Sequence, residues 1–164
     1  MSEVHRLGAA QPDLEILLVE IIAMVLGEEA LPTDNSLPEV PLAIARLIIH
    51  DEADDSYLGV EVRAEGDLAT MLAASLLGEP DPGSEDVLDV IAELGNIAAG
   101  NVKKLLTTNG RLSLPAPVLS AEIPDDPEGT VRAVACLLGH VVELVAMPVS
   151  GADAATRWPG FTPV

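Results

Sequence analysis

The stretch SEDVLDVIAELGNIAAGNVKKLLTTN, residues 84–109, decides the fold because it predicts one long amphipathic helix. Ser84 is a suitable N-cap, two acidic residues follow it, and two lysines lie near the other end. Asn109-Gly110 predicts a left-handed stop. Apolar residues recur at helical spacing and form one face that must be buried: Val87, Leu88, Ile91, Leu94, Ala98, Val102, Leu105 and Leu106.

A row of polar residues lies on the opposite face of this helix. Asp89, Glu93 and Asn96 fall within a stripe roughly 60° wide, and Gly100 continues it one turn further on. At Gly100 the row has no side chain, so a partner's backbone could come close there. On spacing alone, a row of acid and amide residues is more typical of a solvated helix face than of a site.

Composition limits the classes of protein to which the chain can belong. Its 164 residues suit a single domain, and an apolar content of 49% suits a folded one. With 8 Lys and Arg against 27 Asp and Glu, the net charge of −19 argues against nucleic acid or an anionic membrane as partner. Cys136 is the single cysteine and cannot form an internal disulfide. No targeting or membrane-spanning segment is recognisable, so we expect a cytoplasmic protein.

Periodicity and turn residues predict an α+β fold with a mostly antiparallel sheet covered by helices. We expect a tail at 1–12, one domain over 13–150 and a second tail at 151–164. Within the domain, the patterns predict helices at 13–29 and 67–77 besides the long one, a strand pair at 40–50 and 57–64, an extended edge at 112–121, and a hairpin of 130–138 with 140–148. Each half begins with an amphipathic helix followed by strands, which suggests an internal duplication.

Other candidate sites in the sequence are less specific. The acidic connection 51–56 is interpreted as a solvated turn, with a calcium loop as the alternative, although it lacks the alternating ligands and terminal Glu of such a loop. His5, His50 and His140 have no partners at metal-ligand spacing, so we expect no metal site of the chain's own. No glycine-rich loop joins a strand to a helix as a phosphate cradle requires.

The string Asp89-Val-Ile-Ala-Glu93-Leu-Gly-Asn96-Ile-Ala-Ala-Gly100 resembles the signature of the CheX-like chemotaxis phosphatases, in the CheC/CheX/FliY family. That signature is an acidic residue or Ser, three residues, Glu, two residues and Asn. The Asn-Val-Lys continuation and Leu-Ser-Leu-Pro at 112–115 are also typical. The resemblance implies the pseudo-twofold CheC/CheX-like fold over about residues 13–150.

The resemblance also implies a function. Members of this family hydrolyse the aspartyl phosphate of a response-regulator receiver such as CheY. Glu93 would then pair with the receiver's active-site Lys, Asn96 would orient the attacking water, and Asp89 and Gly100 would contact the partner. The Mg²⁺ would belong to the receiver, so the chain would need no cofactor of its own.

Two further expectations follow from the family. CheC members carry the motif twice, but the first helix here has Ile16-x-x-x-Glu20-x-x-Ala23, so we expect a single, CheX-like site. CheX-type members are homodimers that extend a sheet across subunits, and the strands at 130–148 could supply the edge. The alternative function is a non-catalytic module on the same fold, which binds a receiver or belongs to a flagellar switch.

Overall fold

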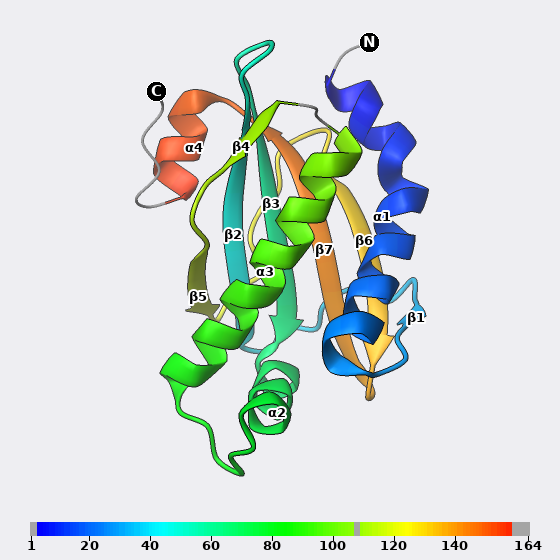
Figure 1. Cartoon of the computed structure of the whole chain (residues 1–164), viewed down its shortest axis with the longest axis vertical. Coiled ribbons are helices and arrows are strands. Elements are labelled where there is room, and N and C mark those ends of the chain that lie inside the picture. Colours follow the sequence, from blue (N-terminus) through cyan, green and yellow to red (C-terminus); the bar gives the residue numbers. More distant parts are fainter. Residues whose placement is uncertain (1–2, 107–108, 159–164) are drawn as a thin grey trace.

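The computed structural model describes residues 3–106 and 109–158 and has an α+β architecture, as predicted. A seven-stranded antiparallel sheet has the order β1-β6-β7-β3-β2-β4, and β5 also pairs with β2. Figure 1 shows α1 and α3 crossing one face of the sheet, with α2 beside one end of α3. In chain order the elements are α1 (Glu3–Leu26), β1 (Leu31–Pro32), β2 (Leu42–Asp51), β3 (Ser56–Glu65), α2 (Gly66–Leu77), α3 (Ser84–Leu106), β4 (Gly110–Leu112), β5 (Ala116–Ser120), β6 (Val131–Leu137), β7 (His140–Val149) and α4 (Gly151–Arg157).

Both predicted strand pairs are confirmed. β2 pairs with β3 over their whole lengths, and β6 pairs with β7. Leu138 and Gly139 connect the second pair with φ values of 51° and 81°. Two successive positive φ values are what a two-residue hairpin turn needs to match the right-handed twist of the strands. The segment at 112–121 is an interrupted edge, because β4 and β5 pair with β2 on either side of a break.

The sheet is buried on both faces, so its central strands contain apolar residues in succession. Alternate residues of β3, such as Val60 and Val62, pack under the helices in the main core. The residues between them face the other side, which is covered in part by α4 and by the connection between β5 and β6. This alternation agrees with the pattern expected for residues 57–64.

The ends of the long helix differ from the prediction. Ser84 is the first helical residue rather than the cap, since the carboxylate of Asp86 accepts from the Gly83 N–H at 3.0 Å and the first helical bond runs to Gly83. At the other end the helix stops at Leu106, and Gly110 begins β4 instead of ending the helix in a left-handed conformation. Residues 107–108 of the expected helix lie outside the described residues.

The buried face of α3 is also shifted from the one expected. Leu105 is 42% exposed and Leu88 is half-buried, whereas Val90, Gly95 and Ala99 are buried. A glycine and an alanine belong to this face because the helix lies very close to β2 of the sheet.

Residues 1–12 were expected to form a tail, but α1 begins at Glu3 and runs through Pro12. The proline removes one helical hydrogen bond. Leu7, at 1% exposure, and Leu14, at 0%, are buried on either side of it, and this burial offsets the loss. The side chain of Gln11 also donates to the Arg132 carbonyl oxygen at 3.2 Å. Tertiary packing therefore extends the helix past a residue that predicts its boundary.

The expected tail at 151–164 is likewise ordered over its first part. Ser150 caps α4 by accepting from the Asp153 N–H at 3.1 Å. Trp158, which follows α4, is 2% exposed and lies against Gly59 and Met147. Residues 159–164 of this tail lie outside the described residues.

A charged network ties the β5–β6 connection and α4 to the second face of the sheet. Asp126 accepts from Arg63 at 2.6 and 3.0 Å, from Arg157 at 3.0 Å, and from Arg132. Burial alone would raise the pKa of Asp126, but the hydrogen bonds from Arg63 and Arg132 outweigh it and lower the pKa to about 2. Arg63 also pairs with Glu61, and both side chains have no exposed area.

The topology limits how a second copy could extend the sheet. β7 lies inside the sheet between β6 and β3, so it cannot be the edge that residues 130–148 were expected to supply. The outer edge of β6 pairs with the short β1 at Cys136 and Ala135. Within residues 3–106 and 109–158, no helix is long and apolar enough to span a membrane.

Candidate functional site

Gly95 positions the candidate site by seating α3 on the sheet. A Cβ added at Gly95 would lie 2.5 Å from the Cβ of Ala45 and 3.0 Å from Cδ1 of Leu47, both on β2. Carbon atoms in van der Waals contact are normally about 3.5–4.0 Å apart. Only glycine allows α3 to come this close, and the opposite face of the helix then points directly away from the sheet.

The predicted polar row occupies that outward face. Asp89, Glu93 and Asn96 are exposed, and Gly100 is half-exposed. None of the first three side chains forms a hydrogen bond or an ion pair with another residue that the structure describes. A Cβ built at Gly100 would meet nothing within 4 Å. The structure therefore brings the four predicted residues together as one accessible surface.

The central pair of the row has useful chemistry. Glu93 and Asn96 are separated by three positions on a continuous helix, so their Cβ atoms lie about 5–6 Å apart. The carboxylate can pair with a cation, while the amide can accept through Oδ1 and donate through Nδ2 at the same time. The rigid backbone of α3 fixes the spacing between these two functions.

The hollows found on the described part of the chain lie away from the Glu93–Asn96 pair. Three open hollows of about 380, 300 and 220 Å³ lie along α1 and the C-terminal part of α3, and neither Glu93 nor Asn96 lines them. The largest is bordered by Ile16 and Glu20 of α1 and by Asn101 and Lys104 of α3. An exposed helical row outside these hollows fits a macromolecule that brings its own concave site.

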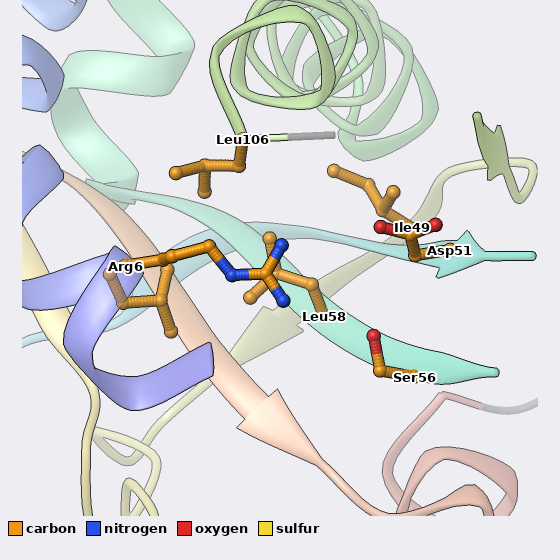
Figure 2. Close-up of a pocket in the computed structure, with 7 residues that line it drawn as sticks. Arg6, Ile49, Asp51, Ser56, Leu58 and Leu106 are labelled. Atoms are coloured by element: carbon orange, nitrogen blue, oxygen red, sulfur yellow. The ribbon is translucent and has the colours of Figure 1, made fainter. Parts of the chain in front are cut away.

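A small cavity lies at the far end of α3, as Figure 2 shows. Its volume is about 20 Å³, which is room for about one water molecule. The guanidinium of Arg6 extends from α1 between Leu106 and Leu58. Arg6 also pairs with Asp54 at 3.2 Å, so the cavity marks the place where α1 is fastened to the β2–β3 turn.

The acidic turn and the histidines bond within the chain. The carboxylate of Asp54 accepts from the Ser56 hydroxyl at 2.5 Å, and His50 pairs with Asp55 at 2.7 Å. His140 lies 3.3 Å from Glu65. Within the described part of the chain, no group of three or more His, Cys, Asp or Glu side chains is placed to hold a metal ion.

The close approach at Gly95 was missed in the sequence. It had a signal, because a glycine in the middle of a helix lowers its stability and usually has a packing reason. The residues of the first helix that were compared with the motif, Ile16, Glu20 and Ala23, are exposed on α1. They form an outward-facing row that lacks the amide.

The comparisons with known proteins agree with this geometry. The family model described as "Chemotaxis phosphatase CheX" matches residues 53–136, about half of the chain. That segment includes α3 and its complete polar row. A comparison with curated protein sequences finds no match.

Solved structures share the fold at low sequence identity. The chemotaxis protein CheX from Vibrio vulnificus is 13% identical with a TM-score of 0.68, over 83% of this chain and 93% of that one. A chain of the CheX–CheY–BeF₃–Mg²⁺ complex from Borrelia burgdorferi is 17% identical with a TM-score of 0.61, over 85% and 98%. A chain of the FliM–SpeE complex from H. pylori is 12% identical with a TM-score of 0.63, over 98% and 100%.

Proposed function

Because this chain belongs to the CheX family of chemotaxis phosphatases, we propose that it hydrolyses the aspartyl phosphate of a CheY-like response-regulator receiver. The observation that carries the proposal is the exposed Glu93–Asn96 pair on the outward face of α3, whose side chains have no partner among the described residues. A site made of two side chains on an exposed helix needs a partner that supplies the electrophile and the concave pocket. A phosphorylated receiver supplies both, and the complex of CheX with CheY from Borrelia burgdorferi supports this class of partner.

In the proposed reaction, Asn96 enters the receiver's site and holds a water molecule in line with the phosphorus atom. Its Oδ1 accepts a hydrogen bond from the water, and its Nδ2 can donate to a phosphoryl oxygen. The water oxygen forms the new bond to phosphorus, and the bond to the aspartyl oxygen breaks. The products are the free carboxylate and inorganic phosphate, which keeps both of the water's protons. Such a transfer depends mainly on positioning and charge, so a nucleophilic side chain is unnecessary.

Glu93 serves docking in this proposal, by pairing with the lysine of the receiver's site. Its carboxylate has no cationic partner within the described residues, so pairing with the receiver's lysine breaks no ion pair within this protein. Asp89 lies one turn towards the N-terminus and contacts the rim of the partner. Gly100 leaves room for a segment of the receiver's backbone. Any Mg²⁺ belongs to the receiver, and the reaction takes place in the cytoplasm.

The proposal is tested by phosphate release from a phosphorylated receiver of the same organism, with this protein at catalytic amounts. Asn96→Ala should abolish turnover while the affinity for the receiver and the thermal stability stay unchanged. Glu93→Ala should weaken binding and raise KM. Full activity of Asn96→Ala would remove the water-positioning role.

The second candidate is a non-catalytic module that binds a receiver or belongs to a flagellar switch. A chain of the FliM–SpeE complex from H. pylori shares the fold over 98% of this chain. This likeness favours the second candidate, because it shows that the fold also occurs in a complex whose name mentions no phosphatase. Tight binding to an activated receiver, with no acceleration of phosphate release from any receiver of the organism, would support this candidate over the enzyme. The proposed homodimer is tested separately, by the mass of the protein in solution.

A further inference from the structure

The cationic side chains of this protein differ in whether they form ion pairs. It has eight Lys and Arg residues, and each of its six arginines forms an ion pair with a carboxylate. Lys103 and Lys104 are the remaining two, and neither forms an ion pair or a hydrogen bond with any other described residue. In a chain with 27 acidic residues, cations without a partner stand out.

One of these two lysines is aligned with Asn96 along the helix axis. The row has spacings of four and three residues, from Asp89 through Glu93 and Asn96 to Gly100, and the next step of three leads to Lys103. Lys103 is half-buried and follows Asn96 by seven residues, which places it about 20° from Asn96, on the side of the row away from Glu93, and about 10 Å further along the axis. The line of Asp89, Asn96 and Lys103 therefore has a carboxylate at one end and a cation at the other.

Lys104 has the same charge but a different position. It is exposed and lies about 100° around the helix from Lys103, about 80° from Asn96 and about 20° from Glu93. It lines hollows that it shares with the acidic residues of α1 and the β2–β3 turn, namely Asp13, Glu20, Asp51 and Asp54. Both lysines are in the last turn of α3, where a positive charge complements the helix dipole. That general role applies to both residues, whereas alignment with Asn96 applies to Lys103 alone.

We infer that Lys103 is a docking residue that pairs with an acidic side chain of the phosphorylated receiver, about 10 Å beyond its phosphoryl group. This inference rests on the proposed function. Glu93 meets the receiver's lysine on one side of Asn96, and Lys103 meets a carboxylate on the other side. The partner's chain crosses α3 between them, at Gly100. A receiver with a basic or neutral group at that position is a poorer partner, so Lys103 sets specificity.

The test compares Lys103→Glu with Lys104→Glu. The two substitutions change the net charge equally and occupy the same helical turn, so they alter long-range attraction and the helix dipole alike. The affinity is measured for a receiver of the same organism held in its active form by beryllofluoride and Mg²⁺, and kcat and KM are measured with the phosphorylated receiver. Lys103→Glu should raise Kd and KM at least about tenfold with kcat unchanged, and Lys104→Glu should raise them less than about threefold. Lys103→Arg should retain the wild-type values.

Equal effects of the two reversals would overturn the inference, because only the overall charge would then matter. A fall in kcat without a rise in KM would overturn it as well. If Lys103→Glu lowers the melting temperature more than Lys104→Glu, the pair Lys103→Gln and Lys104→Gln takes their place, with the same order expected. Zero-length carbodiimide cross-linking of the complex should join Lys103 to a receiver carboxylate, and cross-links through Lys104 alone would contradict the inference.

Asn96→Ala in the same experiments keeps the two proposals apart. If Asn96→Ala retains full turnover, the proposed mechanism is wrong, while the Kd values still test Lys103. If Asn96→Ala abolishes turnover but the two lysine reversals behave alike, only the inference about Lys103 is wrong.

Discussion

Replacing Gly95 by alanine should separate α3 from the sheet by a measurable amount. The added Cβ would lie 2.5 Å from the Cβ of Ala45, about 1–1.5 Å closer than an ordinary contact between carbon atoms. Ala45 is fully buried in β2, which pairs on both sides, so neither the methyl group nor the strand can move aside easily. The helix must therefore shift by about 1 Å.

The expected free energy combines two opposing effects. Overpacking of a buried site costs about 1–3 kcal/mol. Alanine is better than glycine in a helix by about 0.5–1 kcal/mol. Because the contact is between atoms close to rigid backbone, we expect the upper half of the overpacking range and a net destabilisation of about 1–2 kcal/mol.

Gly100→Ala is the matched control in the same helix. A Cβ at Gly100 would meet nothing within 4 Å, so only the gain in helix propensity remains, and stability should rise by about 0.5–1 kcal/mol. The two variants should then differ by about 2 kcal/mol, or by about 4–8 °C in melting temperature for a chain of this length. Urea unfolding followed by far-UV circular dichroism measures the difference. If Gly95→Ala proves as stable as Gly100→Ala, the close packing of α3 on β2 is refuted.

Three further outcomes follow from the same structure. Gly100→Ala, although more stable, should bind an activated receiver several-fold more weakly than the wild type, because the methyl group occupies the partner's closest approach; unchanged affinity would exclude that contact. Asp126→Asn should destabilise the fold by about 3–5 kcal/mol in urea unfolding, because three arginines lose their shared carboxylate. The pKa of Asp126 is lowered to about 2, so its stabilisation is present above its ordinary pKa of 3.8 and is lost as the pH falls towards 2. The wild type should therefore lose stability over that interval and Asp126→Asn should lose less, and parallel curves would contradict the role of Asp126. Gly59→Ala should push against the Trp158 ring, 2.6 Å from the added Cβ, and lower stability by about 1–3 kcal/mol with a red shift in the emission of the single tryptophan; an unshifted spectrum would show that the ring is not packed there.

The elements of the fold were predictable wherever one local pattern dominated. The strands at 57–64 and 140–148 have clear boundaries in glycine and acidic turns, and the structure confirms both. The termini were not predictable in the same way. Pro12 marks a helix boundary by every local criterion, yet Leu7 continues the buried face of α1 beyond it. Trp158 lies in a proline-rich segment, and its burial depends on a glycine about a hundred residues earlier.

The charged network was beyond sequence reasoning for a similar reason. Glu61 and Arg63 alternate with apolar residues as they would on a solvated strand, and both are fully buried. Their partner Asp126 is 63 residues from Arg63, in a connection interpreted only as a turn. Which carboxylate meets which guanidinium depends on the path of that connection over the sheet, and no local pattern encodes it.

The sequence by itself determined the helical row of Asp89, Glu93, Asn96 and Gly100, because the helical repeat alone places residues three and four apart on one face. It also determined the α+β class through the periods of its segments. Only the tertiary structure decided that this face points to solvent, that Gly95 seats the opposite face on β2, and that the arginines are paired while Lys103 has no partner among the described residues. These facts depend on contacts between segments far apart in the chain, which packing and burial select and which local spacing cannot specify.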